Sequence, residues 1–183
     1  INGMWTYWNE RGEKEREGTV EEYNILVRLE EEAKAAAEMA AAEMAAAGWF
    51  QKGYNAYVNK EYDKVISFYL KAIELKPDYA EAYYNLGGTY KNQGNYIKAI
   101  EVSEKAIEID PDFALAYNNL GYAYYNQGNY AKAIESYEKA IELDPNLAQA
   151  YINLGNVYYD QGKPELRISN YKEAARLGHL FSQ

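Results

Sequence analysis

The sequence predicts an all-α protein built as a linear array of stacked helix pairs. A motif of 34 residues recurs along the chain, and its two clearest copies, residues 80–113 and 114–147, are identical at 23 of 34 positions. Two further copies flank them at residues 46–79 and 148–183. Within each copy, apolar residues recur with the period of an α-helix on both sides of a short turn. Self-similarity at a fixed period is typical of arrays in which each unit buries its apolar face against its neighbours.

The composition narrows the classes of partner. The chain has 183 residues, a formal net charge of −9 and no cysteine. The acidic excess argues against nucleic acid and against an anionic membrane surface, because both are bound by clustered lysine and arginine. The absence of cysteine excludes disulfides, zinc–thiolate sites and thiol nucleophiles. It leaves the compartment open, with the cytoplasm as the default, because a reducing compartment suits such a chain but is not required. No apolar run approaches the length of a membrane span.

Residues 1–18 form an aromatic and charged N-terminal segment. Trp5, Tyr7 and Trp8 lie within a few residues of one another, and a charged run follows them. Disordered tails seldom carry such aromatic density. We therefore expect this segment to dock in a groove of this chain or of a neighbouring copy. The alternative is a terminal tag without fixed structure.

Residues 19–47 predict an alanine-rich helix. Thr19 and Glu22 have the spacing of a capping box, in which each side chain accepts a hydrogen bond from the other residue's backbone N–H. The helical pattern then continues to Ala47. One interpretation is a capping helix that covers the first repeat. The other is a stiff helical spacer of engineered origin, an interpretation suggested by the duplicated Ala-Glu-Met-Ala-Ala stretch.

Each repeat is expected to contain two helices separated by a turn. In the second copy, Gly94 ends the first helix because glycine takes the left-handed conformation without steric cost. The second helix begins near Asn95, and Pro111 closes the unit. One face of the first helix carries four packing residues: Tyr83, Leu86, Gly87 and Tyr90.

Small residues at equivalent positions indicate close packing within each pair. Glycine occupies one position of all four first helices: Gly53, Gly87, Gly121 and Gly155. Small residues also recur at two positions of the second helices: Val65, Ala99 and Ala133, and then Ala72, Ala106, Ala140 and Ala174. A bulky substitution at such a position is expected to cost about 1–3 kcal/mol through overpacking.

These residues resemble the tetratricopeptide repeat (TPR), whose pattern of large aromatic, Leu-Gly, Tyr, Ala, aromatic and Pro has the same period. The resemblance spans about residues 46–178, with Pro77, Pro111 and Pro145 one period apart. It implies a right-handed superhelix of antiparallel helix pairs with a concave groove. Scaffolds of this kind bind proteins, so the resemblance implies recognition and not catalysis.

Two repeats depart from the pattern. The first has Lys60 where the others have glycine, so we expect its turn to be strained or differently built. The last has Pro164 in place of an aromatic residue and Arg167 in place of a small one. Because arginine does not fit a small-residue position, we expect the final helix to be loosened or re-docked. The residues after Gly178 are too few to cover the last repeat, which makes self-association through that open end plausible.

The resemblance also implies which side chains of the first helices face the groove. One stripe consists of asparagines, whose amides pair with the backbone of an extended peptide, and others are rich in tyrosine. The alternative for the asparagines is hydrogen bonding between helices or to water. Eight residues are the candidate peptide contacts: Asn85, Asn119, Asn153, Tyr54, Tyr84, Tyr122, Tyr125 and Tyr159.

Other chemistry finds little support in the sequence. Relatives that bind acidic chaperone tails use several lysines and arginines at positions where this chain has residues such as Phe50, Leu115 and Gln149, so we do not expect such a tail to bind. His179 is the one histidine and has no imidazole or thiol partner for a catalytic relay. No phosphate-binding loop or metal-ligand spacing is present. We expect no catalytic residues, no metal and no cofactor.

The leading hypothesis is a non-enzymatic scaffold that binds a peptide segment in its concave groove. The alternative is a self-assembling or engineered fusion in which residues 1–47 mediate oligomerisation and the array of residues 46–183 acts as a spacer. The partners predicted are thus a protein or peptide ligand, and a second copy of the chain through either end.

Overall fold

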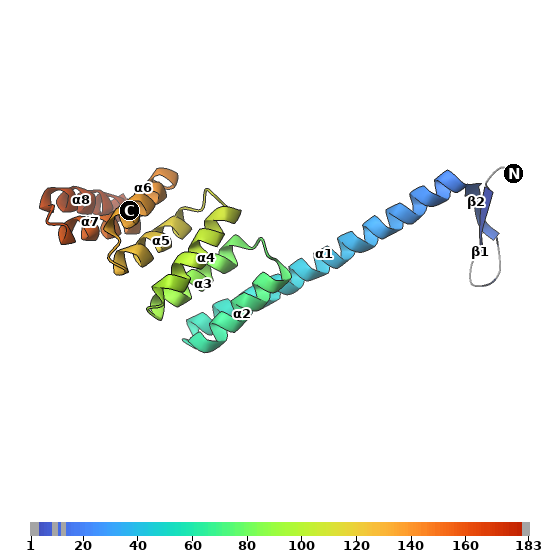
Figure 1. Ribbon diagram of the computed structural model, residues 1–183, viewed down its shortest axis with the longest axis horizontal. Helices are drawn as coiled ribbons and strands as arrows, with labels where there is room; N and C mark the ends of the chain where they lie inside the picture. Colours follow the sequence, from blue (N-terminus) through green and yellow to red (C-terminus); the bar gives the residue numbers. More distant parts are fainter. Residues whose placement is uncertain (1–3, 9–10, 12–13, 181–183) are drawn as a thin grey trace. The chain divides into compact units, whose positions relative to one another are not determined.

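The computed structural model describes residues 4–8, 11 and 14–180. The chain divides into two compact units, Ile1–Met44 and Ala45–Gln183. The second unit contains the repeats, and it is an array of helix pairs (Figure 1). The all-α array predicted from the sequence is confirmed. In the part of the chain that the structure describes, no helix combines the length and the apolar character needed to cross a membrane.

The first unit contains a two-stranded hairpin that the sequence analysis did not predict. Strand β1, Met4–Trp8, pairs antiparallel with strand β2, Lys14–Thr19, and the register shifts between Tyr7 and Trp8. Tryptophan and tyrosine favour strands, which explains why this segment is extended rather than helical. The side chains of Trp5 and Tyr7 lie outside the described part of the chain. The expectation that this segment docks in a groove depends on them and stays a prediction.

Helix α1, Val20–Val58, follows the hairpin directly. The capping box is confirmed: the Glu22 N–H donates to Thr19 Oγ1 at 3.2 Å, and the Thr19 N–H donates to Glu22 Oε2 at 2.7 Å. The predicted end at Ala47 is wrong, because α1 continues through Gly48 into the first repeat. A single glycine costs a helix about 1 kcal/mol, and the strong helix formers that precede Gly48 offset this cost.

The remaining helices form the other seven members of the array. Their bounds are α2 Tyr62–Leu75, α3 Ala80–Asn92, α4 Tyr96–Ile109, α5 Ala114–Asn126, α6 Tyr130–Leu143, α7 Ala148–Asp160 and α8 Pro164–Leu180. The last part of α1, then α3, α5 and α7 are the first helices of the four repeats. Helices α2, α4, α6 and α8 are the second helices.

The turn of the first repeat is built like the others and is strained. Gly94, Gly128 and Gly162 have φ angles of 71°, 74° and 69°, and Lys60 at the equivalent position has φ 60°. The hydrogen bonds agree as well: the Glu61 N–H donates to the Ala56 carbonyl at 2.9 Å, as in the later turns. Of the two expectations for this turn, the strained one is therefore correct and the different construction is wrong.

The final helix is not loosened. Helix α8 packs along α7, as α6 packs along α5. The Arg167 guanidinium lies over the ring of Tyr159, 4.1 Å from its centroid, and over that of Tyr171 at 5.1 Å. Because the guanidinium is flat and stacks on aromatic faces, arginine is accommodated where a small residue stands in the other repeats. The expected re-docking is wrong for this reason.

Candidate peptide-binding face

The first helices lie side by side and form one face of the array. Helix α3 contacts α5, and α5 contacts α7. Within the described residues, the second helices α4, α6 and α8 do not contact one another as closely as the first helices do. Because first helices are closer together than second helices, the array curves with the first helices on its inner side. We call their exposed sides the inner face.

Two hydrogen bonds at equivalent places tie neighbouring first helices together. The Asn92 amide donates to the Tyr57 hydroxyl at 3.0 Å, and the Tyr125 hydroxyl donates to Asp160 Oδ2 at 2.5 Å. Both bonds join residues 35 apart in the sequence. The bond to Asp160, with desolvation as a further cause, raises the pKa of Tyr125 to about 12. These bonds hold successive repeats in register.

The three candidate asparagines differ in how far they are already paired. Buried Asn153 donates to Asn118 Oδ1 at 3.0 Å and accepts from the Gln149 amide at 2.9 Å. Buried Asn119 accepts from the Lys91 ammonium at 3.0 Å. Half-buried Asn85 donates only to a carbonyl of its own helix. Bonding between helices therefore accounts for Asn153, and in part for Asn119.

The five candidate tyrosines fall into an open and a packed group. Tyr54 and Tyr159 are 51% and 57% exposed. Tyr84 is half-buried against the ring of Phe113 at 5.1 Å, and burial raises its pKa. Tyr122 is half-buried, with the Lys91 ammonium 5.1 Å from its centroid. Tyr54 and Tyr159 thus offer the most surface to a ligand.

The structure brings three residues together that the candidate set only partly contained. Lys91 of α3 contacts both Asn119 and Tyr122 of α5, and Lys91 was not among the candidates. Asn118 and Asp160 were also missed, although each bonds to a candidate. Three of the hydrogen bonds between first helices join residues 35 apart, and this recurring separation was the signal that could have found Asn118 and Asp160.

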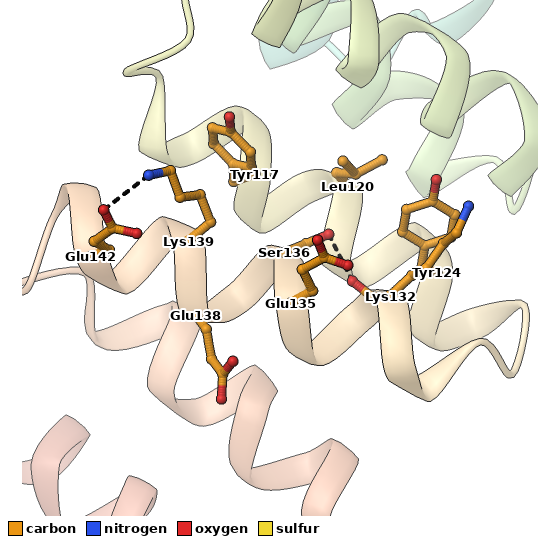
Figure 2. A pocket seen from close by; sticks show the side chains of 9 residues that line it. All are labelled: Tyr117, Leu120, Tyr124, Lys132, Glu135, Ser136, Glu138, Lys139 and Glu142. Atoms are coloured by element: carbon orange, nitrogen blue, oxygen red, sulfur yellow. Dashed lines mark hydrogen bonds and ion pairs between the residues drawn. The ribbon is translucent and has the colours of Figure 1, made fainter.

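A separate pocket of about 580 Å³ lies between α5 and α6 (Figure 2). Its walls carry charges of both signs, and Lys139 pairs there with Glu142 at 2.9 Å. The Ser136 hydroxyl donates to the Lys132 carbonyl at 2.8 Å. None of the eight candidate residues lines this pocket. It is therefore distinct from the inner face.

Comparison with known families identifies the class. A model described as "TPR repeat" matches residues 89–128 and 121–162. Models described as "Tetratricopeptide repeat" match residues 46–79, 148–177 and 68–101. Together these matches cover most of the chain. The chain belongs to the tetratricopeptide repeat family.

Solved structures show the same fold. The crystal structure of MamA is similar with a TM-score of 0.69 and 28% identity, over 75% of this chain and 80% of that one. The TPR domain of Arabidopsis OM64 has a TM-score of 0.63 and 25% identity, over 64% and 98% of the two chains. The first TPR of Spaghetti (RPAP3), bound to the HSP90 peptide SRMEEVD, has a TM-score of 0.64 and 22% identity, over 66% and 95%.

A search of curated protein sequences found no match. The class of the chain rests on its repeats and its structural relatives, which define it as a protein-interaction scaffold of the tetratricopeptide class.

Proposed function

We propose that the chain binds a peptide segment of a partner protein along the inner face. The exposure of Tyr54 and Tyr159 carries this proposal, because both are large side chains on first helices and more than half of each is accessible. Tyrosine supplies contact area with little loss of conformational entropy, which makes it frequent in binding surfaces. The two residues belong to the first and last repeats, so a ligand that contacts both spans the array.

The remaining candidates have different roles in this proposal. Asn85 contacts the ligand backbone, since its side-chain Oδ1 accepts no bond from the described residues and its side-chain Nδ2 donates to the Glu81 carbonyl of its own helix. Tyr84, Tyr122 and Tyr125 belong to the two middle repeats and contact side chains of the ligand between the two open tyrosines. Asn153 sets the spacing of the helices through its bond to Asn118, and Asn119 offers the ligand the amide hydrogens that it donates to none of the described residues.

The ligand differs from the acidic tail seen with one structural relative. The RPAP3 domain is bound to the peptide SRMEEVD, but its identity to this chain is low enough that only the fold is shared. The inner face here has Phe50, Leu115 and Gln149 at positions where tail-binding relatives are basic. We therefore propose that the ligand is an internal, extended segment and not a terminal acidic tail.

Selection from a random heptapeptide library displayed on phage tests the proposal. The full chain should enrich a recognisable sequence pattern, and the selected peptide should bind in a fluorescence anisotropy assay. Tyr54→Ser and Tyr159→Ser should each weaken binding about fivefold or more, the loss that defines a significant contact. Asn85→Ala should weaken it to a similar or smaller extent.

Ile97→Ser is the matched control, because Ile97 is 73% exposed on the second helix α4. It should leave affinity unchanged. Failure to enrich any pattern, or equal affinity of the tyrosine variants and the wild type, rejects peptide binding on the inner face.

Self-association is a second candidate function, favoured by apolar side chains exposed outside the inner face. On α1, Leu29, Met39 and Met44 are 50%, 67% and 77% exposed. On α8, Leu166 and Ile168 are 43% and 53% exposed. A second copy of the chain that docked on either helix would remove the apolar surface of these side chains from water. Light scattering of the full chain over a range of concentrations tests this candidate.

The oligomer should dissociate in a Leu29→Lys/Met39→Lys variant if α1 mediates it. It should dissociate in a Leu166→Lys/Ile168→Lys variant if the C-terminal end does. A monomer at every concentration rejects the second candidate.

A further inference from the structure

The second repeat departs from the other three at two positions of the inner face. Gly88 stands where the other first helices have Tyr54, Tyr122 and Asn156. One turn further along α3, Lys91 stands where the others have tyrosine: Tyr57, Tyr125 and Tyr159. Both changes fall at the junction between α3 and α5. Among the residues that the structure describes, the tyrosine bond that ties α1 to α3 and α5 to α7 has no counterpart at this junction.

Lys91 is a cation among neutral groups. Its ammonium donates to Asn119 Oδ1 at 3.0 Å and lies over the ring of Tyr122. Among the described residues no carboxylate lies within ion-pair distance of it, whereas Lys105 and Lys139 pair with glutamates at 2.8 and 2.9 Å. Desolvation by burial lowers the pKa of Lys91. The charge is thus partly withdrawn from water without an opposite charge in compensation.

The space beside this cation is open because of Gly88. A Cβ built on Gly88 would meet only one side-chain atom within 4 Å, Nδ2 of Asn119 at 3.8 Å. In α5, Tyr122 stands at the position equivalent to Gly88, and its ring takes up the corresponding room there. The Asn119 amide nitrogen donates to no acceptor in the described part of the chain. Two donors, one of them charged, therefore border an opening in the inner face.

We propose that Lys91 and Asn119 form a subsite for a carboxylate of the bound peptide, with Gly88 leaving room for it. A carboxylate accepts hydrogen bonds from both groups at once, and bonds in which the donor or the acceptor is ionised are about twice as strong as bonds between neutral groups. It also supplies the negative charge that Lys91 lacks. This inference rests on peptide binding to the inner face and adds one required group to the ligand.

The net charge of the protein makes an acidic preference diagnostic. A chain with a formal charge of −9 repels acidic peptides at long range. Enrichment of aspartate or glutamate must therefore come from a local contact. A single lysine accepts one carboxylate, in contrast to a clamp of several basic residues.

Parallel selections from the heptapeptide library test the subsite. The wild-type chain should enrich peptides with an acidic residue at one fixed position. Lys91→Gln should lose that preference while still enriching the rest of the pattern, since glutamine keeps a donor for Asn119. Lys91→Arg should retain the preference. Lys98→Gln, which removes a lysine from α4, should behave like the wild type and is the control for net charge.

Synthetic peptides then identify the source of the carboxylate. Replacing the selected acidic residue with its amide should weaken binding to the wild type about tenfold, as expected for a charge-assisted bond, and should not weaken binding to Lys91→Gln. Peptides with a free or an amidated C-terminus should bind alike if a side chain is the ligand. If only the free C-terminus matters, the carboxylate is terminal: the subsite then holds, and the internal position of the ligand segment in the proposed function is overturned.

The outcomes separate this inference from the proposed function. Peptides enriched without any acidic preference, or with a preference that Lys91→Gln retains, overturn the subsite and leave peptide binding intact. If no peptide is enriched on any variant, both are overturned. In the variants, thermal unfolding monitored by circular dichroism should show that the fold is unchanged.

Discussion

Gly121 lies against the ring of Tyr137, and a Cβ built on the glycine would stand 2.7 Å from the tyrosine Cε1. The same relationship joins Gly53 to Tyr69, at 2.6 Å. Real side chains do not approach so closely, so glycine is the residue that lets the ring of the second helix lie on the first. In the second repeat the ring is absent, and Gly87 faces Ser103 Oγ at 3.0 Å.

Gly121→Ala is expected to destabilise the array. Alanine favours a helix by about 1 kcal/mol over glycine, but displacing the buried ring of Tyr137 costs about 1–3 kcal/mol. Gly87→Ala should be neutral or less harmful, because the small Ser103 side chain and the tip of Val102 can give way. Urea denaturation followed by circular dichroism measures both. Equal losses in the two variants would show that ring contact is not the cause.

Lys60→Gly should stabilise the first repeat. Lys60 has φ 60°, a conformation that costs a residue with a Cβ about 1–2 kcal/mol relative to glycine. Part of this gain is offset because glycine loses more backbone entropy on folding, so we expect an increase of about 1 kcal/mol. The reciprocal control is Gly128→Lys in the third repeat, which should destabilise by a similar amount. No change in the urea midpoint of Lys60→Gly would contradict the interpretation.

Local pattern allowed most of the array to be predicted from the sequence. The capping box of Thr19 and Glu22 and the turns at the repeated glycines depend on neighbours in the chain, and both were confirmed. The end of the alanine-rich helix was not predicted, because Gly48 is a helix breaker only where other signals support it. The hairpin of Met4–Trp8 and Lys14–Thr19 was not predicted, because its second strand is mostly charged and lacks the residue types that favour strands.

The inner face was harder to predict because its contacts cross between repeats. The stacking of Arg167 on Tyr159 depends on a rotamer that sequence position does not reveal. The pairing of Lys91 with Asn119 likewise depends on how closely α3 approaches α5. Equivalent residues of the repeats have the same backbone position but different side-chain partners. The stripe of asparagines is therefore uniform in the sequence, whereas the hydrogen bonds of its members differ in the structure.

Tyr137→Phe should stabilise the array or leave it unchanged. The Tyr137 side chain is fully buried, and its hydroxyl has no hydrogen-bond partner among the described residues. Removing a buried group that makes no bond removes a desolvation penalty. Tyr124→Phe is the comparison, because the Tyr124 hydroxyl donates to Glu104 Oε1 at 2.8 Å.

Losing that bond should cost about 1 kcal/mol. Thermal unfolding of both variants at neutral pH decides the matter. A clear destabilisation by Tyr137→Phe would mean that its hydroxyl is hydrogen-bonded in solution.

Stability should fall as the pH rises from about 10 to 12. The bond to Asp160 raises the pKa of Tyr125 from 10.0 to about 12. A group whose pKa is higher in the folded state contributes stability that is complete below the unfolded pKa and is lost as the pH passes the folded pKa. Tyr125 therefore contributes to the fall between these two values.

Asp160→Asn should reduce the steepness of that fall, because it removes the carboxylate that holds the Tyr125 proton. Urea midpoints measured at intervals up to pH 11.5 test this expectation. A pH profile identical to that of the wild type would show that the bond does not contribute.

Asn153 and Asn85 occupy equivalent positions, yet their replacement by alanine should have different effects. Asn153→Ala leaves Asn118 and Gln149 without the bonds that it provides, and Asn118 is buried. Unpaired buried polar groups cost about 1–3 kcal/mol each, so the junction between α5 and α7 should weaken. Asn85→Ala breaks only a bond within its own helix and should leave the urea midpoint nearly unchanged.

The variants Asn85→Ala and Asn153→Ala together distinguish a structural role of these asparagines from a role in ligand recognition. Asn85→Ala should weaken binding of a selected peptide without loss of stability. Asn153→Ala should lower stability, and any effect on affinity should follow from that loss. Were Asn153→Ala to weaken binding while its urea midpoint stayed at the wild-type value, Asn153 would contact the ligand directly. Its bond to Asn118 would then be secondary to recognition, and the asparagine stripe would act as one ladder along the inner face.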